Sequence, residues 1–154
     1  MDISNSIEKL DKKTIDKSVY GGLALVCDNN PMNLAIICEH LRKAGLNPII
    51  AVDGDDCVRI VRERARKYLY TKDKIKQFDL ILIDVHKPSI NGLETSVKVR
   101  GIDRDVPIIA LTDDIFIENR MTYRDYGIVD CLGKPFRKQD LLYCVQKYVT
   151  PVNM

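Results

Sequence analysis

The 154-residue chain has the length and composition of one globular domain, because 45% of its residues are hydrophobic and 30% are charged. No apolar stretch approaches the roughly 18 residues that a membrane helix needs, and the first residues are polar, so we expect neither a membrane segment nor a signal peptide. A net charge of +2 does not indicate a polyanionic partner, and five cysteines without CxxC spacing are expected to be reduced core residues of a cytoplasmic protein.

The predicted elements alternate between strand and helix five times. Five short apolar runs are expected to be strands: Leu23–Cys27, Pro48–Val52, Leu80–Ile83, Val106–Leu111 and Ile128–Leu132. Helical patterns follow them at Asn30–Gly45, from Gly54 to about Tyr68, from Asn91 onward, at Ile115–Tyr126 and at Arg137–Tyr148. We therefore expect one domain over residues 21–150, with a polar tail at 1–20 and a short tail at 151–154.

Local residues predict how the first helix begins and ends. Asn30 is a good N-cap, Pro31 suits the first helical position, and Gly45 is expected to end the helix. The run Leu80–Ile83 is aliphatic at every position, which is typical of a strand buried on both faces of a parallel sheet. Five βα units joined by right-handed crossovers predict a doubly wound α/β sandwich of three layers.

Polar residues follow four of the predicted strands. They are Asp28 and Asn29 after the first strand, Asp84 after the third, Thr112 after the fourth and Lys134 after the fifth. Ligands of open parallel sheets bind at the carboxyl ends of the strands. These side chains are therefore the candidate functional residues.

The same segments resemble the response-regulator receiver domain, the phosphoacceptor module of two-component and phosphorelay signalling. The resemblance covers about Gly22 to Val149. It rests on four segments: VCDNNPMNL (26–34), LILIDVHKPSINGL (80–93), PIIALT (107–112) and LGKPF (132–136). It implies a flavodoxin-like (βα)5 fold with sheet order 2-1-3-4-5.

The resemblance also implies roles for three side chains. Asp84 would be the phosphoacceptor, which receives a phosphoryl group from a phosphohistidine. Thr112 would donate its hydroxyl to one phosphoryl oxygen, and the Lys134 ammonium would pair with another. Such a module catalyses its own phosphoryl acceptance and hydrolysis and is not an enzyme in the usual sense, unless it is part of a hybrid histidine kinase.

A magnesium ion is implied as the cofactor. By resemblance, Asp84, the residue at position 29 and the backbone carbonyl of His86 would be direct ligands, and Asp28 would act through water. The family has a second acid where this chain has Asn29, so weaker magnesium binding is expected. A role for Asn29 in capping the loop, without contact to the ion, is the alternative.

Three further departures bear on activity. Asp113 follows Thr112 where receivers carry a small residue, so crowding and charge repulsion would slow phosphoryl acceptance. Cys131 stands where the family has an aromatic switch residue, and Lys87 replaces the usual methionine before Pro88. Asn29, Asp113 and Cys131 favour the alternative of a pseudo-receiver, which docks a partner protein without being phosphorylated, whereas Lys87 lies on the rim and matters least.

The implied partner is a histidine kinase or a histidine phosphotransfer protein, and the family also allows a homodimer through the fourth helix, fifth strand and fifth helix. No nucleic-acid or membrane partner is expected. The basic run at residues 62–67 is interpreted as a solvated helix face opposite an apolar stripe: Val58, Val61, Ala65 and Tyr68. A flavodoxin-like cofactor protein is not favoured, because the loop after the first strand is acidic.

Overall fold

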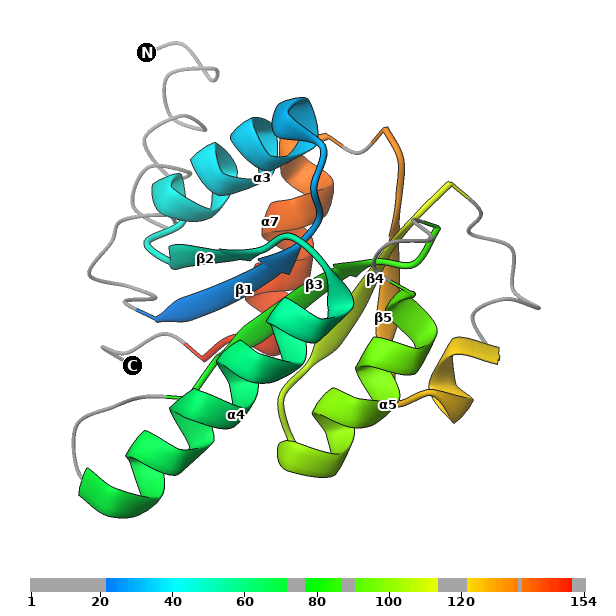
Figure 1. Ribbon diagram of the computed structural model, residues 1–154. Coiled ribbons are helices and arrows are strands. Elements are labelled where there is room, and N and C mark those ends of the chain that lie inside the picture. Colours follow the sequence, from blue (N-terminus) through cyan, green and yellow to red (C-terminus); the bar gives the residue numbers. More distant parts are fainter. Residues whose placement is uncertain (1–21, 72–76, 87–90, 114–121, 136, 151–154) are drawn as a thin grey trace, which may run out of the picture.

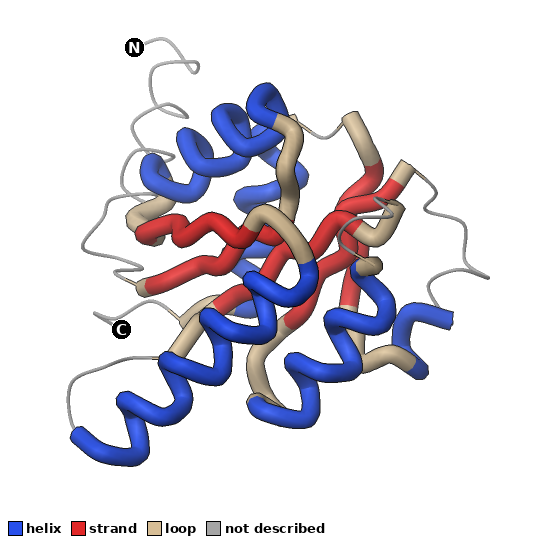
Figure 2. Tube along the Cα trace, in the orientation of Figure 1, coloured by secondary structure: helices blue, strands red, loops and turns tan. Residues whose placement is uncertain are grey.

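The computed structural model describes residues 22–71, 77–86, 91–113, 122–135 and 137–150. They form a parallel sheet of five strands in the order β2-β1-β3-β4-β5, which lies between two pairs of helices (Figure 1). Helices α3 and α7 cover one face, and α4 and α5 cover the other (Figure 2). The three-layer sandwich and the sheet order are both confirmed. The tails expected at residues 1–20 and 151–154 lie outside the described residues.

All five predicted strands are present, with small shifts at their ends: β1 (Leu23–Cys27), β2 (Asn47–Ala51), β3 (Leu80–Asp84), β4 (Ile108–Thr112) and β5 (Asp130–Gly133). The expected fourth strand began at Val106, but β4 begins after Pro107, which has no N–H for the ladder. The expected fifth strand began at Ile128, whose N–H donates to the Tyr123 carbonyl of the preceding turn. Turn bonds therefore delay the start of β5.

Four helices have bounds close to those expected: α3 (Pro31–Lys43), α4 (Gly54–Thr71), α5 (Gly92–Ile102) and α7 (Lys138–Tyr148). Of the helix expected at Ile115–Tyr126, residues 122–125 are helical, and 115–121 lie outside the described residues. Arg137 is the N-cap of α7 and not its first helical residue.

The start of α3 follows the local sequence. The Asn30 side chain accepts hydrogen bonds from the N–H groups of Met32, at 3.0 Å, and Asn33, at 3.1 Å, and Pro31 begins the helix. At the other end, Gly45 has a φ of 89°, which a residue with a side chain rarely adopts. The cap directs α3 away from the carboxyl end of β1, where Asp28 lies.

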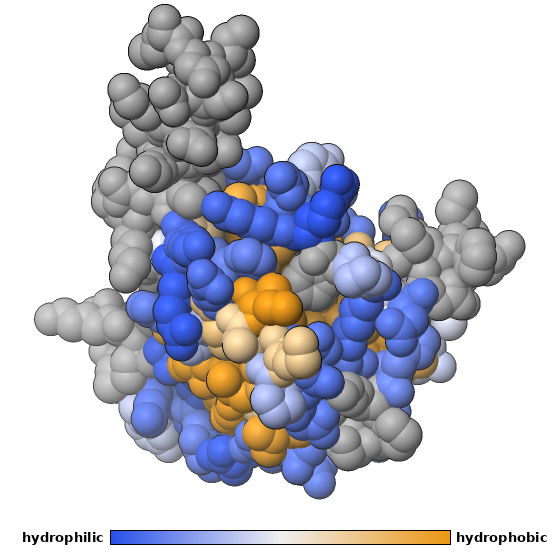
Figure 3. Space-filling model, turned by 90° about the horizontal axis from the view of Figure 1, so that it is seen from above, coloured by the Kyte–Doolittle hydropathy of each residue, from blue (hydrophilic) through white to orange (hydrophobic). Residues whose placement is uncertain are grey.

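The core lies on both faces of the sheet, and β3 runs through its centre. Every side chain of Leu80–Ile83 is fully buried, as expected for a central strand. Ile81 and Ile83 pack into one core cluster and Leu80 and Leu82 into the other. The outer surface is mostly hydrophilic, with apolar residues gathered in the middle of the face shown in Figure 3.

One prediction about α4 is wrong. Tyr68 was expected on the buried stripe with Val58 and Val61, which are indeed buried, but its residue surface is 45% exposed. The helix continues three residues beyond Tyr68 and extends past the sheet, so none of the described layers covers its last turn (Figure 1). The basic run at 62–67 lies mostly at the surface, as expected.

Two expectations from composition concern residues inside the domain. All five cysteines are buried free thiols, which agrees with their predicted role as core residues. Within the described ranges, no helix has the length and apolar character that crossing a membrane requires.

Candidate functional site

The carboxyl ends of four neighbouring strands meet at one edge of the sheet. Cys27 of β1 pairs with Ile83 of β3, so the next residue of each strand, Asp28 and Asp84, lies at the same level of the sheet. Thr112 of β4 pairs with Gly133 of β5, which precedes Lys134. The structure therefore places at one edge of the sheet four of the five side chains that the sequence predicted: Asp28, Asp84, Thr112 and Lys134.

Asp84 is fully buried, and both of its carboxylate oxygens have partners. Oδ1 accepts a hydrogen bond of 2.9 Å from the His86 N–H, and Oδ2 forms an ion pair with the Lys134 ammonium. Gly92 at the start of α5 is required here, because a Cβ atom would lie 2.6 Å from the Asp84 carbonyl oxygen. The carboxylate is thus held in one position at the end of the central strand.

Asp28 is the second buried carboxylate of the site. Its Oδ1 accepts a 3.0 Å hydrogen bond from the Asn30 N–H, and its Oδ2 lies 3.4 Å from Asn33 Nδ2 and 4.0 Å from Lys134 Nζ. The ammonium therefore lies close to two buried carboxylates, Asp28 and Asp84. Sequence reasoning missed Asn33, although its place one turn into a helix that starts beside Asp28 was a usable signal.

The Thr112 hydroxyl is buried and contacts two other side chains. Its Oγ1 lies 2.5 Å from His86 Nε2 and 3.2 Å from the Tyr123 hydroxyl. The sequence suggested a role for the backbone of His86, and the structure adds a contact of its imidazole. Sequence reasoning missed Tyr123. The one indirect signal was that Cys131 stands where the family has an aromatic residue.

The departures from the family pattern lie around this cluster. Asn29 is exposed, in contrast to Asp28 beside it, and Asp113 is exposed directly after Thr112. Cys131 is buried in the core, and Lys87 lies outside the described residues.

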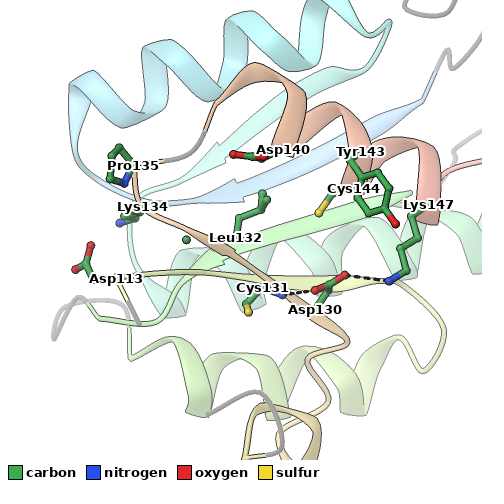
Figure 4. Close-up of a pocket in the computed structure, with 11 residues that line it drawn as sticks. Asp113, Asp130, Cys131, Leu132, Lys134, Pro135, Asp140, Tyr143, Cys144 and Lys147 are labelled. Carbon is green, nitrogen blue, oxygen red and sulfur yellow. Dashed lines mark hydrogen bonds and ion pairs between the residues drawn. The ribbon is translucent and has the colours of Figure 1, made fainter. Parts of the chain in front are cut away.

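A cavity of about 680 Å³ opens beside β5 and α7. Asp113, Lys134 and Pro135 lie at one end of it, and Asp130 with Lys147 lies at the other (Figure 4). The peptide bond between Lys134 and Pro135 is cis. Asp113 therefore adds a carboxylate near Lys134 on the outer side of the site.

A neutral thiol precedes Asp28. A hydrogen bond with Cys57, together with burial, raises the pKa of the Cys27 thiol. Its Sγ also donates to the Asp53 carbonyl at 3.5 Å. Because a thiol with a raised pKa is a poor nucleophile, Cys27 adds neither charge nor reactivity to the site.

The oxygen donors of the site fit Mg²⁺. This ion prefers octahedral oxygen ligation and keeps several waters, so few protein ligands are enough. Two buried carboxylates share one ammonium, which leaves negative charge for a cation. The Asn29 amide lies in the loop that contains Asp28, and the His86 carbonyl lies in the loop directly after Asp84. In the described part of the chain, no three His, Cys, Asp or Glu side chains gather as a metal-binding group. The donor set therefore suits an ion bound partly by water and backbone oxygen.

A (βα)5 sandwich with two buried carboxylates, a threonine hydroxyl and a lysine at the carboxyl edge of its sheet is the arrangement of receiver-like phosphoacceptor domains. Residues 24–146 match the family described as the response regulator receiver domain. This match covers most of the chain, and the chain belongs to that family.

Curated relatives share the same domain. The chain is 29% identical over 125 residues to the transcription factor SKN7 of Saccharomyces cerevisiae, covering 81% of this chain and 18% of that protein. It is 30% identical over 125 residues to two-component system protein A of Emericella nidulans, covering 80% of this chain and 17% of that protein. The chain thus spans less than a fifth of the length of these relatives.

Solved structures show the same fold. The receiver domain of the sensor histidine kinase PA1611 from Pseudomonas aeruginosa, crystallised with magnesium in its active-site cleft, is 29% identical with a TM-score of 0.67 and covers 83% of this chain and 97% of that one. The receiver domain of the histidine kinase CKI1 from Arabidopsis thaliana, complexed with Mg²⁺ and BeF3⁻, has a TM-score of 0.73 at 21% identity. It covers 88% of this chain and 97% of that one, and at this identity it supports the fold alone.

Proposed function

We propose that this receiver domain accepts a phosphoryl group from a phosphohistidine on the carboxylate of Asp84. One observation carries the proposal: a fully buried carboxylate ends the central strand and forms an ion pair with Lys134. A buried carboxylate without a partner would cost several kcal/mol, and the Lys134 ammonium offsets that cost while it holds the nucleophilic oxygens in place.

The transfer is a nucleophilic displacement at phosphorus. One Asp84 oxygen forms a bond to phosphorus while the phosphorus–nitrogen bond of the donor breaks, and the electron pair of that bond stays on the imidazole. Phosphoryl transfer depends mainly on positioning and on neutralising charge on the transferred oxygens. Among the described residues, the Lys134 ammonium and the Thr112 hydroxyl are the proposed donors for that purpose.

We also propose Mg²⁺ as the cofactor, held by Asp28, Asn29, Asp84 and the backbone carbonyl of His86. It would supply positive charge next to the phosphoryl oxygens. The excess of buried carboxylate charge over ammonium charge supports this assignment. The magnesium ion in the related receiver of the P. aeruginosa kinase supports it as well.

The proposed phosphodonor is a histidine kinase or a histidine phosphotransfer protein. Relatives of this chain include the peroxide stress-activated histidine kinase mak3 of Schizosaccharomyces pombe and the hybrid signal transduction histidine kinase L of Dictyostelium discoideum. The five free thiols support a reducing, cytoplasmic location. A homodimer through β5, α7 and the helix before β5 is also proposed, and sedimentation with and without phosphorylation would test it.

Intact-mass spectrometry after incubation with Mg²⁺ and acetyl phosphate tests the function. The wild type should gain the mass of one phosphoryl group, and Asp84→Asn should gain none. Asp125→Asn, at an exposed acid outside the site, is the matched control and should behave as the wild type. EDTA in place of Mg²⁺ should abolish uptake.

Two results would contradict the proposal. Uptake by Asp84→Asn equal to that of the wild type would show that another residue is the acceptor. No uptake by the wild type, from acetyl phosphate or from a phosphorylated histidine phosphotransfer protein, would favour the pseudo-receiver, to which the departures at Asn29 and Asp113 point.

A further inference from the structure

Three polar side chains form a row that leads from the edge of the site into the core. His86 Nε2 lies 2.5 Å from Thr112 Oγ1, and Thr112 Oγ1 lies 3.2 Å from the Tyr123 hydroxyl. His86 is exposed, whereas Thr112 is fully buried and Tyr123 is 6% exposed. The row joins the loop after β3, strand β4 and the helical segment at residues 122–125.

The hydrogens of this row restrict what Thr112 can do. A threonine hydroxyl has one hydrogen and two acceptor lone pairs. If Thr112 gave its hydrogen to Tyr123, none would remain for a phosphoryl oxygen. A buried tyrosine hydroxyl needs an acceptor for its own hydrogen, and the Thr112 oxygen provides one. With Tyr123 as the donor, the contact between the two hydroxyls does not use the Thr112 hydrogen.

We infer that Tyr123 is a positioning residue for phosphoryl acceptance, an inference that rests on the proposed function. Its hydroxyl donates to Thr112 Oγ1 and thereby orients the Thr112 hydrogen toward the phosphoryl site. A hydroxyl that accepts a hydrogen bond is also a stronger donor, because bonds in a chain polarise one another. Tyr123 thus acts on the phosphoryl group through Thr112 without touching it.

The packing of Tyr123 holds its hydroxyl in place. Its ring belongs to the core cluster that also contains Cys131, and its backbone carbonyl accepts the N–H groups of Tyr126, at 3.0 Å, and Ile128, at 3.1 Å. Ser96 Oγ of α5 donates to the Tyr126 carbonyl at 2.9 Å, which anchors the same turn. An aromatic hydroxyl therefore reaches Thr112 from the segment before β5, although β5 itself carries a cysteine.

Tyr123→Phe removes the hydroxyl and keeps the ring. Under Mg²⁺ and acetyl phosphate, phosphorylation of Asp84 should be about three- to tenfold slower than in the wild type, the equivalent of one ordinary hydrogen bond. Tyr126→Phe, in the same turn, is the matched control and should keep the wild-type rate. The Thr112 methyl signal in NMR spectra should shift in Tyr123→Phe and remain in place in Tyr126→Phe.

A double-mutant cycle separates positioning from a structural role. In a Thr112→Ala background, Tyr123→Phe should cause no further loss of rate, because the group through which it acts is gone. Equal rates of wild type and Tyr123→Phe, or a full additional loss in the Thr112→Ala background, would overturn the inference while leaving Asp84 as the acceptor. A wild type that takes up no phosphoryl group would overturn the proposed function and this inference together.

Discussion

Replacing Lys134 by methionine should destabilise the domain strongly. The Lys134 side chain is 16% exposed, and its ammonium lies near the side chains of Asp28 and Asp84, which are both 0% exposed. Methionine keeps much of the volume of the stem and removes only the charge. The variant therefore buries two carboxylates without their ammonium.

The size of the effect follows from the geometry. At an effective dielectric of about 20, two unit charges 4 Å apart interact by about 4 kcal/mol, and Lys134 Nζ lies 4.0 Å from Asp28 Oδ2. The contact with Asp84 adds to this, whereas the variant no longer has to desolvate an ammonium. Removing one partner of a buried ion pair costs about 3–5 kcal/mol. Because Lys134 keeps some exposure, we expect the free energy of unfolding to fall by about 3 kcal/mol.

Urea unfolding in EDTA measures this loss, which corresponds to a fall in Tm of roughly 6–12 °C for a domain of this size. The control is Lys147→Met, whose exposed ammonium lies 3.4 Å from Asp130 and should matter much less. Adding Mg²⁺ should restore part of the loss in Lys134→Met, because a cation that binds only the native state stabilises it. Equal losses in the two variants would refute the argument that Lys134 compensates buried charge.

Three further changes have directions that the structure predicts. Asn29→Asp should tighten Mg²⁺ binding by about tenfold at low ionic strength, and equal affinities in an NMR titration would place the Asn29 side chain away from the ion. Asp113→Ala should be phosphorylated by acetyl phosphate faster than the wild type, because the variant lacks a carboxylate that repels the anionic donor. The gain should be only about threefold, because solvent screens this exposed carboxylate. An unchanged rate would mean that Asp113 does not repel the donor. Burial lowers the pKa of His40 from its ordinary value of 6.5. As the pH falls, His40 therefore takes up a proton in the unfolded chain at a higher pH than in the folded one, and the free energy of unfolding should fall as the pH drops through 6.5. His40→Leu should flatten this dependence in urea unfolding at pH 7.5 and 5, and a wild type that is already flat would contradict the assignment.

The sequence alone predicted the order of elements and the residues at the strand ends. Four aliphatic residues in a row at 80–83 indicate a strand buried on both faces, and the Asn30–Pro31 pair indicates where α3 begins. These signals are local, since each depends on the period of apolar residues or on the hydrogen bonds of one turn. The position of a polar residue directly after a buried strand was therefore visible before any tertiary contact was known.

The ends of the elements were less visible. The start of β5 depends on whether Ile128 bonds to the sheet or to the preceding turn, and α4 continues past the sheet, which leaves Tyr68 exposed. Both features depend on which neighbours a segment meets in the folded domain. An apolar pattern along the chain contains no information on where a neighbouring layer ends.

Only the tertiary structure decided which polar groups share a partner. Lys134 lies between Asp28 and Asp84 because β1, β3, β4 and β5 are adjacent in the sheet, and strand order is a property of the whole fold. The contacts of the Thr112 hydroxyl with His86 and Tyr123 depend further on the direction of each side chain. Strand-end chemistry is encoded locally, but hydrogen-bond partners across the sheet are set by packing, because only packing brings residues so far apart in sequence within bonding distance.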